Sequence, residues 1–276
     1  MSVELAIAAA IEQMEHKYGI RVLYAAESGS RAWGFASPDS DYDVRFIYLK
    51  PLRWYLSIGD PSDTHEAMLP GDLDLSGWEL RKALRLYAKG NMALNEWLGS
   101  PQIYRELGAT AQQLRQLLPQ WFQPMQAAHH YLSMGRGTYQ DYLQTDAVAI
   151  KKLFYALRPL LACRWVRLHG TQPPTDFAEL LEGVELTSRE RTEVDRALLD
   201  KAAAVEQQAW PLSRWWRHWL ETELSLAEAA MEGLPTRKRP PLQTLDHYLQ
   251  QALMEVPDDP WRQIAVSPNT TSARDD

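Results

Sequence analysis

Cysteine is nearly absent from this sequence, whose 276 residues include only Cys163. A single cysteine excludes an intramolecular disulfide framework and lacks the partner thiolates of a zinc cage. Basic residues are in the minority, since 29 Lys and Arg face 36 Asp and Glu and leave a formal net charge of −7. This balance excludes a polycationic nucleic-acid coat and a basic membrane-surface protein, although a local basic groove remains compatible with it.

Long apolar runs are missing as well. No stretch approaches the roughly 20 apolar residues of a membrane-spanning helix, and the N-terminal segment lacks the basic region of a secretory signal. We therefore expect neither export nor membrane contact, and the single cysteine favours a reducing cytoplasm. The hydrophobic content of 45% is enough for one large core or two modest ones.

Helix and strand signals alternate in the first hundred residues. Apolar residues at helical spacing predict a helix from Ile7 to Tyr18 that Gly19 ends. Ser76 and Glu79 form a capping-box pattern in front of a further helix, which should stop at Gly90. Short strands are predicted for residues 21–26, residues 42–49 and a segment around Leu73 and Leu75.

Strand signals fade from about residue 110 onward, where Leu, Ala, Gln and Glu recur with helical periodicity. The predicted fold class is therefore α+β, with a small mixed, antiparallel-rich α/β domain followed by an all-α domain. The predicted boundaries are 1–110 for the α/β domain, 111–265 for the helical domain and 266–276 for a polar, disordered tail. The tryptophan cluster at 214–220 is more typical of core packing than of a binding surface.

The stretch ESGSRAWGFASPDSDYDVRFIYL, residues 27–49, combines a glycine-serine turn with two acids at the start of a hydrophobic strand. Side chains alternate along a strand, so Asp41 and Asp43 share one face with Cα atoms roughly 6.6 Å apart. Two carboxylates in a sheltered cleft favour a cation, and Mg²⁺ prefers carboxylate, phosphate and water oxygens. Gly29 permits close approach of the backbone to a phosphate, and Ser30 adds a hydroxyl donor.

A third carboxylate would complete such a site. Asp72 and Asp74 alternate onto one face of the next predicted strand, where either could bind metal or act as a general base. Asp74 is preferred because it lies directly before the predicted helix, but sequence alone leaves Asp72 open.

Several cations could accompany these acids. Arg31 could reach a phosphate or neutralise Asp41 or Asp43, and Arg45, on the face of Asp43, is more typical of a structural counter-charge. Helical spacing places three more residues on one face, where they could meet a triphosphate and a base or form an ordinary helix surface: Lys151, Tyr155 and Arg158.

Aromatic residues offer one further binding pattern. Arg53-Trp54-Tyr55 follows the second predicted strand directly. The trio could stack a base, although aromatic residues in this position more often fill a core.

Gly29-Ser30, ten intervening residues and then Asp41-Tyr42-Asp43 resemble the signature of the polymerase-β-type nucleotidyltransferase superfamily. Three longer stretches resemble the predicted nucleotidyltransferase family that is named for an RNA repair pathway: GSRAWGFASPDSDYDVRFIY, GWELRKALRLYAKGNMALNEWLGSP and KKLFYALRPLLACRW. The resemblance implies a palm that binds an Mg-NTP, such as Mg-ATP, and a helical domain that closes over the nucleotide. It also implies Gly29 and Ser30 as triphosphate contacts and Asp41, Asp43 and a third acid as ligands of Mg²⁺, or of Mn²⁺ in its place.

The expected activity is transfer of NMP from an NTP to a hydroxyl, with release of pyrophosphate. The preferred acceptor is an RNA end, and a small molecule or a protein hydroxyl is the alternative. Two other classes stay open at this point: a nucleotide-binding regulator without turnover, and an interaction protein that docks a partner through the tryptophan-rich segment.

Overall fold

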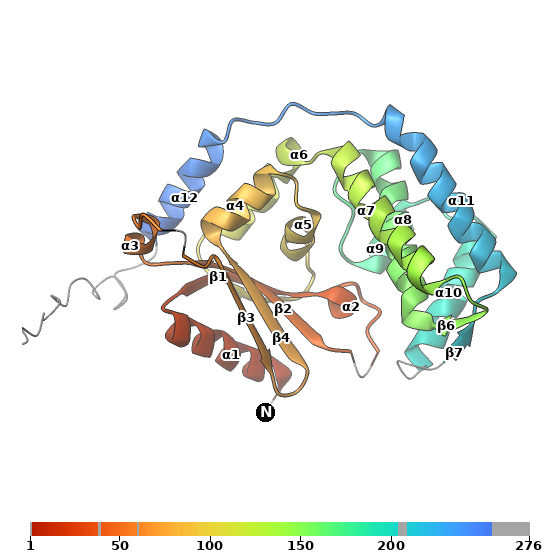
Figure 1. Cartoon of the computed structure of the whole chain (residues 1–276), viewed down its shortest axis with the longest axis horizontal. Coiled ribbons are helices and arrows are strands. Elements are labelled where there is room, and N and C mark those ends of the chain that lie inside the picture. The colour runs from red at the N-terminus through yellow and green to blue at the C-terminus, as the bar shows by residue number, and fades with distance from the viewer. Residues whose placement is uncertain (1, 38–39, 60, 204–208, 256–276) are drawn as a thin grey trace, which may run out of the picture.

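A five-stranded mixed sheet organises the first half of the chain (Figure 1). The computed structural model describes residues 2–37, 40–59, 61–203 and 209–255. In the sheet order β3-β4-β2-β1-β5, β2 and β4 are parallel and the other neighbours are antiparallel, which confirms the predicted fold class. The strands are β1 (Arg21–Ser28), β2 (Tyr42–Leu49), β3 (Thr64–Leu69), β4 (Leu73–Glu79) and β5 (Ile103–Glu106).

Helices cover both faces of this sheet. The helices of the first half are α1 (Val3–Tyr18), α2 (Gly29–Ala32), α3 (Leu52–Tyr55), α4 (Leu80–Ala88), α5 (Met92–Leu98) and α6 (Thr110–Trp121). Val44 and Phe46 of β2 pack with α1, whereas Ile47 and Leu49 pack with α4, α5 and α6 on the other face. Because side chains alternate, Asp43 points to the face of Ile47. Burial of both faces explains the apolar run of β2.

The second half is a helical lobe around the long pair α7 and α8, on the right of Figure 1. Trp216 and Trp219 are buried in its core, which confirms the core-packing interpretation of the tryptophan cluster. Residues Ala147–Ala149 (β6) and Ala209–Pro211 (β7) pair antiparallel, although no strand is predicted in this half. The helices are α7 (Pro124–Tyr142), α8 (Ile150–His169), α9 (Phe177–Gly183), α10 (Ser188–Ala203) and α11 (Arg214–Ala230), with a 3₁₀ turn, η1 (Met231–Gly233).

The last described helix, α12 (Gln243–Glu255), returns to the sheet lobe and packs on α4 through Leu245 and Ala252 (Figure 1). Helix α6 also joins the core of the sheet lobe. The sheet lobe thus has one hydrophobic cluster on each face of the sheet, and the helical lobe has a third. The domain boundary at 110/111 stays a prediction. The predicted tail, 266–276, lies outside the described residues.

Local signals succeed where a cap or a continuous apolar run defines an element. Helix α1 ends at Gly19, whose φ of 56° is left-handed, and β2 has the predicted bounds. The capping-box prediction is wrong: Ser76 lies inside β4, and Glu79 is itself the N-cap of α4, accepting hydrogen bonds from the backbone N–H groups of Arg81 and Lys82. Pairing of β4 with both β2 and β3 extends this strand through Ser76.

Membrane insertion finds no support in the helices. Within the described ranges, none has the combination of length and apolar character that crossing a bilayer requires.

Candidate active site

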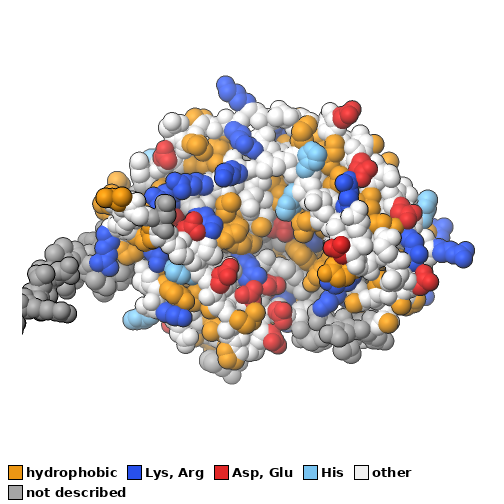
Figure 2. Space-filling model, in the orientation of Figure 1, with side chains coloured by type: hydrophobic (Ala, Val, Ile, Leu, Met, Phe, Trp, Pro, Cys, Tyr) orange, Lys and Arg blue, Asp and Glu red, His pale blue; other side chains and the backbone are white. Residues whose placement is uncertain are grey.

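Two carboxylates meet at one end of the sheet. Asp43 in β2 and Asp74 in β4 are register partners, with side chains 30% and 29% exposed. Arg45 Nη2 lies between them, 2.9 Å from Asp43 Oδ1 and 2.8 Å from Asp74 Oδ2. Arg45 is therefore the counter-charge of both acids. Figure 2 shows acidic side chains gathered around a basic one in the lower middle of the molecule.

The competing acid, Asp72, lies outside this arrangement. It occupies the turn before β4 with a left-handed φ of 55°, and its carbonyl oxygen accepts a hydrogen bond from Tyr42 N at 2.8 Å. The structure thus places Asp74 beside Asp43 and leaves Asp72 in the turn. A metal-binding role for Asp74 remains a prediction.

Asp41 is exposed directly in front of β2. Burial raises the pKa of the Asp43 carboxyl, and the charges of Asp74 and Asp41 raise it further, against the opposing charge of Arg45. Asp74 and Asp41 are thus close enough for their charges to act on Asp43. A cation added to this group would relieve that repulsion.

Gly29 brings the glycine-serine turn against these carboxylates. It has a left-handed φ of 62°, and a Cβ at this position would overlap Asp43 Oδ2. Ser30 follows it in the short helix α2. Two features therefore require glycine at this position: the left-handed backbone conformation and the close approach to Asp43.

We expect Gly29→Ala to displace the Asp43 carboxylate and to destabilise the fold by about 1–3 kcal/mol. The matched control is Gly71→Ala, because Gly71 also has a positive φ, 86°, but its Cβ would meet nothing within 4 Å. Urea denaturation measures the free energy of unfolding of both variants. An equal loss in the two would mean that backbone conformation, and not contact with Asp43, explains the requirement for glycine.

Arg31 holds the loop in front of β2. Its Nη2 donates to the carbonyl oxygen of Ser40 at 2.6 Å and its Nε donates to that of Asp41 at 3.0 Å, while the guanidinium lies 3.8 Å from the centre of the Tyr42 ring. These contacts orient the backbone of Asp41. The phosphate contact predicted for Arg31 remains untested.

A buried acid that the sequence analysis missed hydrogen bonds to the backbone of Asp43. Glu27 of β1 is 0% exposed; its Oε1 accepts a hydrogen bond from Asp43 N at 2.8 Å, and Tyr104 O–H donates to its Oε2. Burial raises the pKa of Glu27. The available signal was a glutamate that directly follows the apolar run VLYAA of this strand.

Helix α8 reaches the turn through Trp33, the residue after α2. The Tyr155 ring lies 6.0 Å from the Trp33 ring, and the Arg158 guanidinium lies 4.5 Å from it. Arg158 is only 1% exposed, bonds Glu96 Oε1 at 2.9 Å and donates to the Thr175 carbonyl oxygen. Arg158 is therefore buried and is not part of a solvated helix surface. The nucleotide contact predicted for it remains untested.

The other predicted nucleotide contact on α8, Lys151, is half-buried near the start of the helix. The structure therefore brings Gly29, Asp43 and Asp74 together directly. Tyr155 and Arg158 contact Trp33, whose N–H donates to the Gly29 carbonyl oxygen at 3.0 Å.

The donor set suits a hard divalent cation. Within the described ranges, no three His, Cys, Asp or Glu side chains are already grouped as a metal cage. Mg²⁺ rarely needs such a cage, because it is bound by one or two carboxylates and completed by water and phosphate oxygens. Asp43 and Asp74 offer these oxygens, with the exposed Asp41 directly before β2, so the residues fit Mg²⁺ or Mn²⁺.

Removal of the guanidinium should make the site dependent on added cation. We expect Arg45→Gln to lower the melting temperature in EDTA, because Asp43 and Asp74 then lose their shared counter-charge, and Mg²⁺ should restore more stability to this variant than to the parent protein. The control is Arg115→Gln, which breaks the ion pair with Glu106 elsewhere. Equal responses to Mg²⁺ in the two variants would contradict the assigned cation site.

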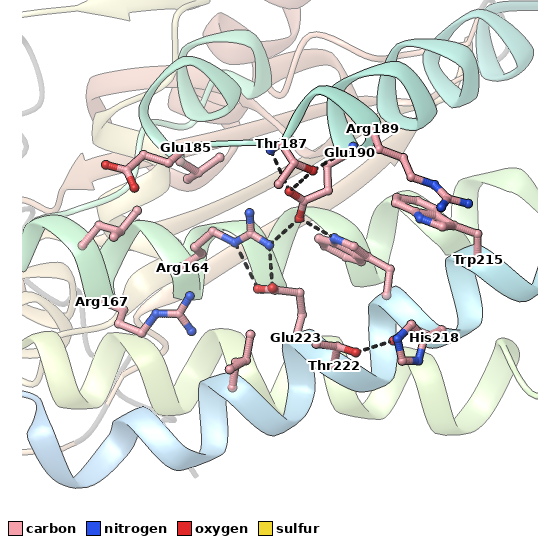
Figure 3. Close-up of a pocket in the computed structure, with 14 residues that line it drawn as sticks. Arg164, Arg167, Glu185, Thr187, Arg189, Glu190, Trp215, His218, Thr222 and Glu223 are labelled. Atoms are coloured by element: carbon pink, nitrogen blue, oxygen red, sulfur yellow. Dashed lines mark hydrogen bonds and ion pairs between the residues drawn. The ribbon is translucent and has the colours of Figure 1, made fainter.

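The helical lobe contains a hollow of about 480 Å³ between α8, α10 and α11 (Figure 3). At its base Arg164 bonds Glu223 through Nε at 3.1 Å and bonds Glu190 at 2.8 Å, while Trp219 Nε1 donates to Glu190 at 2.7 Å. The charges at its base are therefore already paired. This network is a structural element of the helical lobe, separate from the carboxylates of the sheet.

Glu190 should give the protein a specific sensitivity to acid. Burial alone would raise its pKa, but hydrogen bonds from Arg164 and Trp219 outweigh burial and lower the pKa from 4.5 to about 2. A lowered folded-state pKa contributes stability above about pH 4.5 that is lost as pH falls toward 2, up to about 3 kcal/mol. Glu190→Gln should flatten the pH dependence of the unfolding free energy in this window, as urea unfolding at a series of pH values measures. An unchanged pH dependence in this variant would contradict the contribution assigned to Glu190.

The glycine-serine turn, the paired strand carboxylates and the mixed sheet define a polymerase-β-type nucleotidyltransferase fold. The chain belongs to the RNA repair pathway DNA polymerase beta family (RlaP), which it matches over residues 3–251. It is 42% identical over 246 residues to the uncharacterized protein YcgL of Bacillus subtilis (strain 168), a match that covers 89% of this chain and 95% of that protein.

A more distant likeness is found among solved structures. The nucleotidyltransferase-like protein from Exiguobacterium sibiricum 255-15 aligns with 14% identity and a TM-score of 0.31, over 90% of this chain and 80% of that one.

Proposed function

We propose that the chain is an Mg²⁺-dependent nucleotidyltransferase of the cytoplasm that transfers NMP from an NTP to a hydroxyl, preferably at an RNA end. The observation that carries this proposal is the alignment of Asp43 and Asp74 on parallel strands, with Gly29 packed against Asp43. Membership of a family named for RNA repair supports the choice of acceptor.

The residues divide the work by position. Asp43 and Asp74, together with the exposed Asp41, would hold Mg²⁺, and Mn²⁺ could replace it. When bound, the cation would neutralise charge on the triphosphate. The backbone at Gly29 and the Ser30 hydroxyl would contact the β- and γ-phosphates, because a glycine turn lets N–H groups approach closely.

In the proposed reaction the acceptor hydroxyl oxygen attacks the α-phosphorus, and the bond from that phosphorus to the bridging oxygen of the β-phosphate breaks. Pyrophosphate leaves, and the hydroxyl proton passes to Asp74, the acid that orients the acceptor. A regulator that binds nucleotide without this step, and transfer to a small molecule or a protein hydroxyl, are the competing outcomes.

Pyrophosphate release from each of the four NTPs with Mg²⁺, with and without a bulk RNA pool, tests the proposal. The expected result is release that RNA stimulates and that Asp41→Ala loses. Saturable NTP binding without pyrophosphate release under all these conditions would indicate a nucleotide-binding regulator. Pyrophosphate release that RNA does not change would indicate another acceptor.

A further inference from the structure

A second hollow, of about 460 Å³, opens in the sheet lobe away from the carboxylates. It lies where α1 ends and β2 leads into α3, and Figure 1 shows α2 and α3 toward opposite ends of the sheet. Lys50 follows Asp43 by seven residues, roughly 23 Å along an extended strand. The hollow is therefore distinct from the candidate active site. The described residues that line it are Tyr18, Gly19, Lys50, Pro51, Arg53, Trp54 and Ser57.

The charge around this hollow is positive, in contrast to the acidic chain. Lys50 and Arg53 line it, and none of its described lining residues is acidic. Arg81 adds a third cation, with its guanidinium 5.0 Å from the Trp54 ring, and Lys17 lies 4.9 Å from the Tyr18 ring. A polyanion is the ligand that such a cluster attracts.

The nearby acids are already engaged. Buried Glu79 accepts hydrogen bonds from the Tyr55 hydroxyl at 2.5 Å and from the N–H groups that begin α4. Asp63 pairs with Lys82 at 2.8 Å. Lys50 Nζ itself donates to the Tyr18 carbonyl oxygen at 3.1 Å. Among the described residues, the four cations at the hollow outnumber these two acids, so the local charge stays positive.

The aromatic rings beside these cations are held in place. Tyr18 stacks on His65 with ring centres 4.0 Å apart, and Trp54 packs edge-on against Tyr55 at 5.0 Å. Both Tyr18 and Trp54 remain half-buried at the hollow, so part of each ring is accessible. Ordered aromatic rings alternating with cations are the pattern that binds single-stranded nucleic acid, with bases on the rings and phosphates on the cations.

We propose that the hollow formed by Tyr18, Lys50, Arg53 and Trp54 binds a single-stranded segment of the RNA acceptor, away from the end that reacts. The choice of RNA rests on the proposed function. The separation from Asp43 lets one strand engage both places, so that the hollow contributes affinity for the acceptor and the carboxylates contribute chemistry.

Fluorescence anisotropy with a labelled single-stranded oligouridine, without NTP, tests this site. We expect Arg53→Glu to weaken binding about tenfold and to reduce its dependence on salt, because one phosphate contact is lost. Trp54→Ala should weaken binding about five- to a hundredfold, as expected for one stacked base. Arg189→Glu is the matched control, because Arg189 is also exposed and lies over a tryptophan, Trp215, but in the helical lobe. The RNA affinity of this variant should equal that of the parent protein.

Unchanged RNA affinity in Arg53→Glu and Trp54→Ala, both verified as folded by circular dichroism, would overturn the proposal. So would binding to phosphatidylserine vesicles that needs these residues while RNA binding does not. This binding measurement does not depend on turnover. If the parent protein binds RNA but releases no pyrophosphate, and Arg53→Glu weakens the RNA binding, the transferase proposal alone is refuted. RNA-stimulated transfer with normal RNA binding in Arg53→Glu would refute this site alone.

Discussion

Asp43→Asn is expected to reduce nucleotidyl transfer by about 10²–10³-fold or more, with the protein still folded. The substitution keeps the shape of the side chain and removes the charge that would hold the cation. The fold should tolerate the substitution because Asp43 is partly buried, and burial disfavours the charged form of its carboxyl group. Steady-state pyrophosphate release at saturating Mg-NTP measures the effect, and near-ultraviolet circular dichroism verifies the packing.

The third acid provides a matched pair of variants for the same assay. Asp74→Asn should lose activity as Asp43→Asn does, since Asp74 is the register partner of Asp43. Asp72→Asn should retain activity, because Asp72 lies in the preceding turn. Loss of activity in Asp72→Asn with full activity in Asp74→Asn would show that the third acid is misassigned.

Arg158→Met should have the largest effect on stability, a loss of about 3–5 kcal/mol in the free energy of unfolding. The guanidinium is buried against Trp33, and its removal leaves Glu96 without its charge partner. In the double variant with Glu96→Gln, part of the loss should return, because the unpaired charge is gone. Urea denaturation of the two single variants and the double variant measures the coupling.

Lys151→Met on the same helix is the control for this prediction, and we expect a change within about 1 kcal/mol. The competing interpretation of Arg158 is a direct contact with the triphosphate. If Arg158→Met keeps the stability of the parent protein and loses only NTP affinity, the triphosphate contact is established. That result would contradict the role of Arg158 as the buried charge partner of Glu96.

The sequence predicts the parts of this site that depend on local chemistry. The left-handed Gly19, the apolar run of β2 and the glycine-serine turn each follow from nearby residues, and all three occur where expected. The pairing of Asp43 with Asp74 instead depends on the register of β2 and β4, which is a long-range property. Sequence alone therefore leaves Asp72 open.

The missed features share a physical cause. Glu27 acquires its partner Asp43 from 16 residues away, so no local pattern marks it. The strands β3 and β5 are short and carry charged residues among few apolar ones, so their strand signal is weak. At Ser76, strand pairing outweighs a local helix-capping signal.

Isothermal titration of NTP into the protein, with Mg²⁺ and with EDTA, tests most directly whether the carboxylates of β2 and β4 form a nucleotide site. We predict saturable binding that requires Mg²⁺ and is strongly weakened by Asp43→Asn but not by Asp72→Asn. Binding of equal strength in EDTA, or no binding of any of the four NTPs with Mg²⁺, would contradict this account.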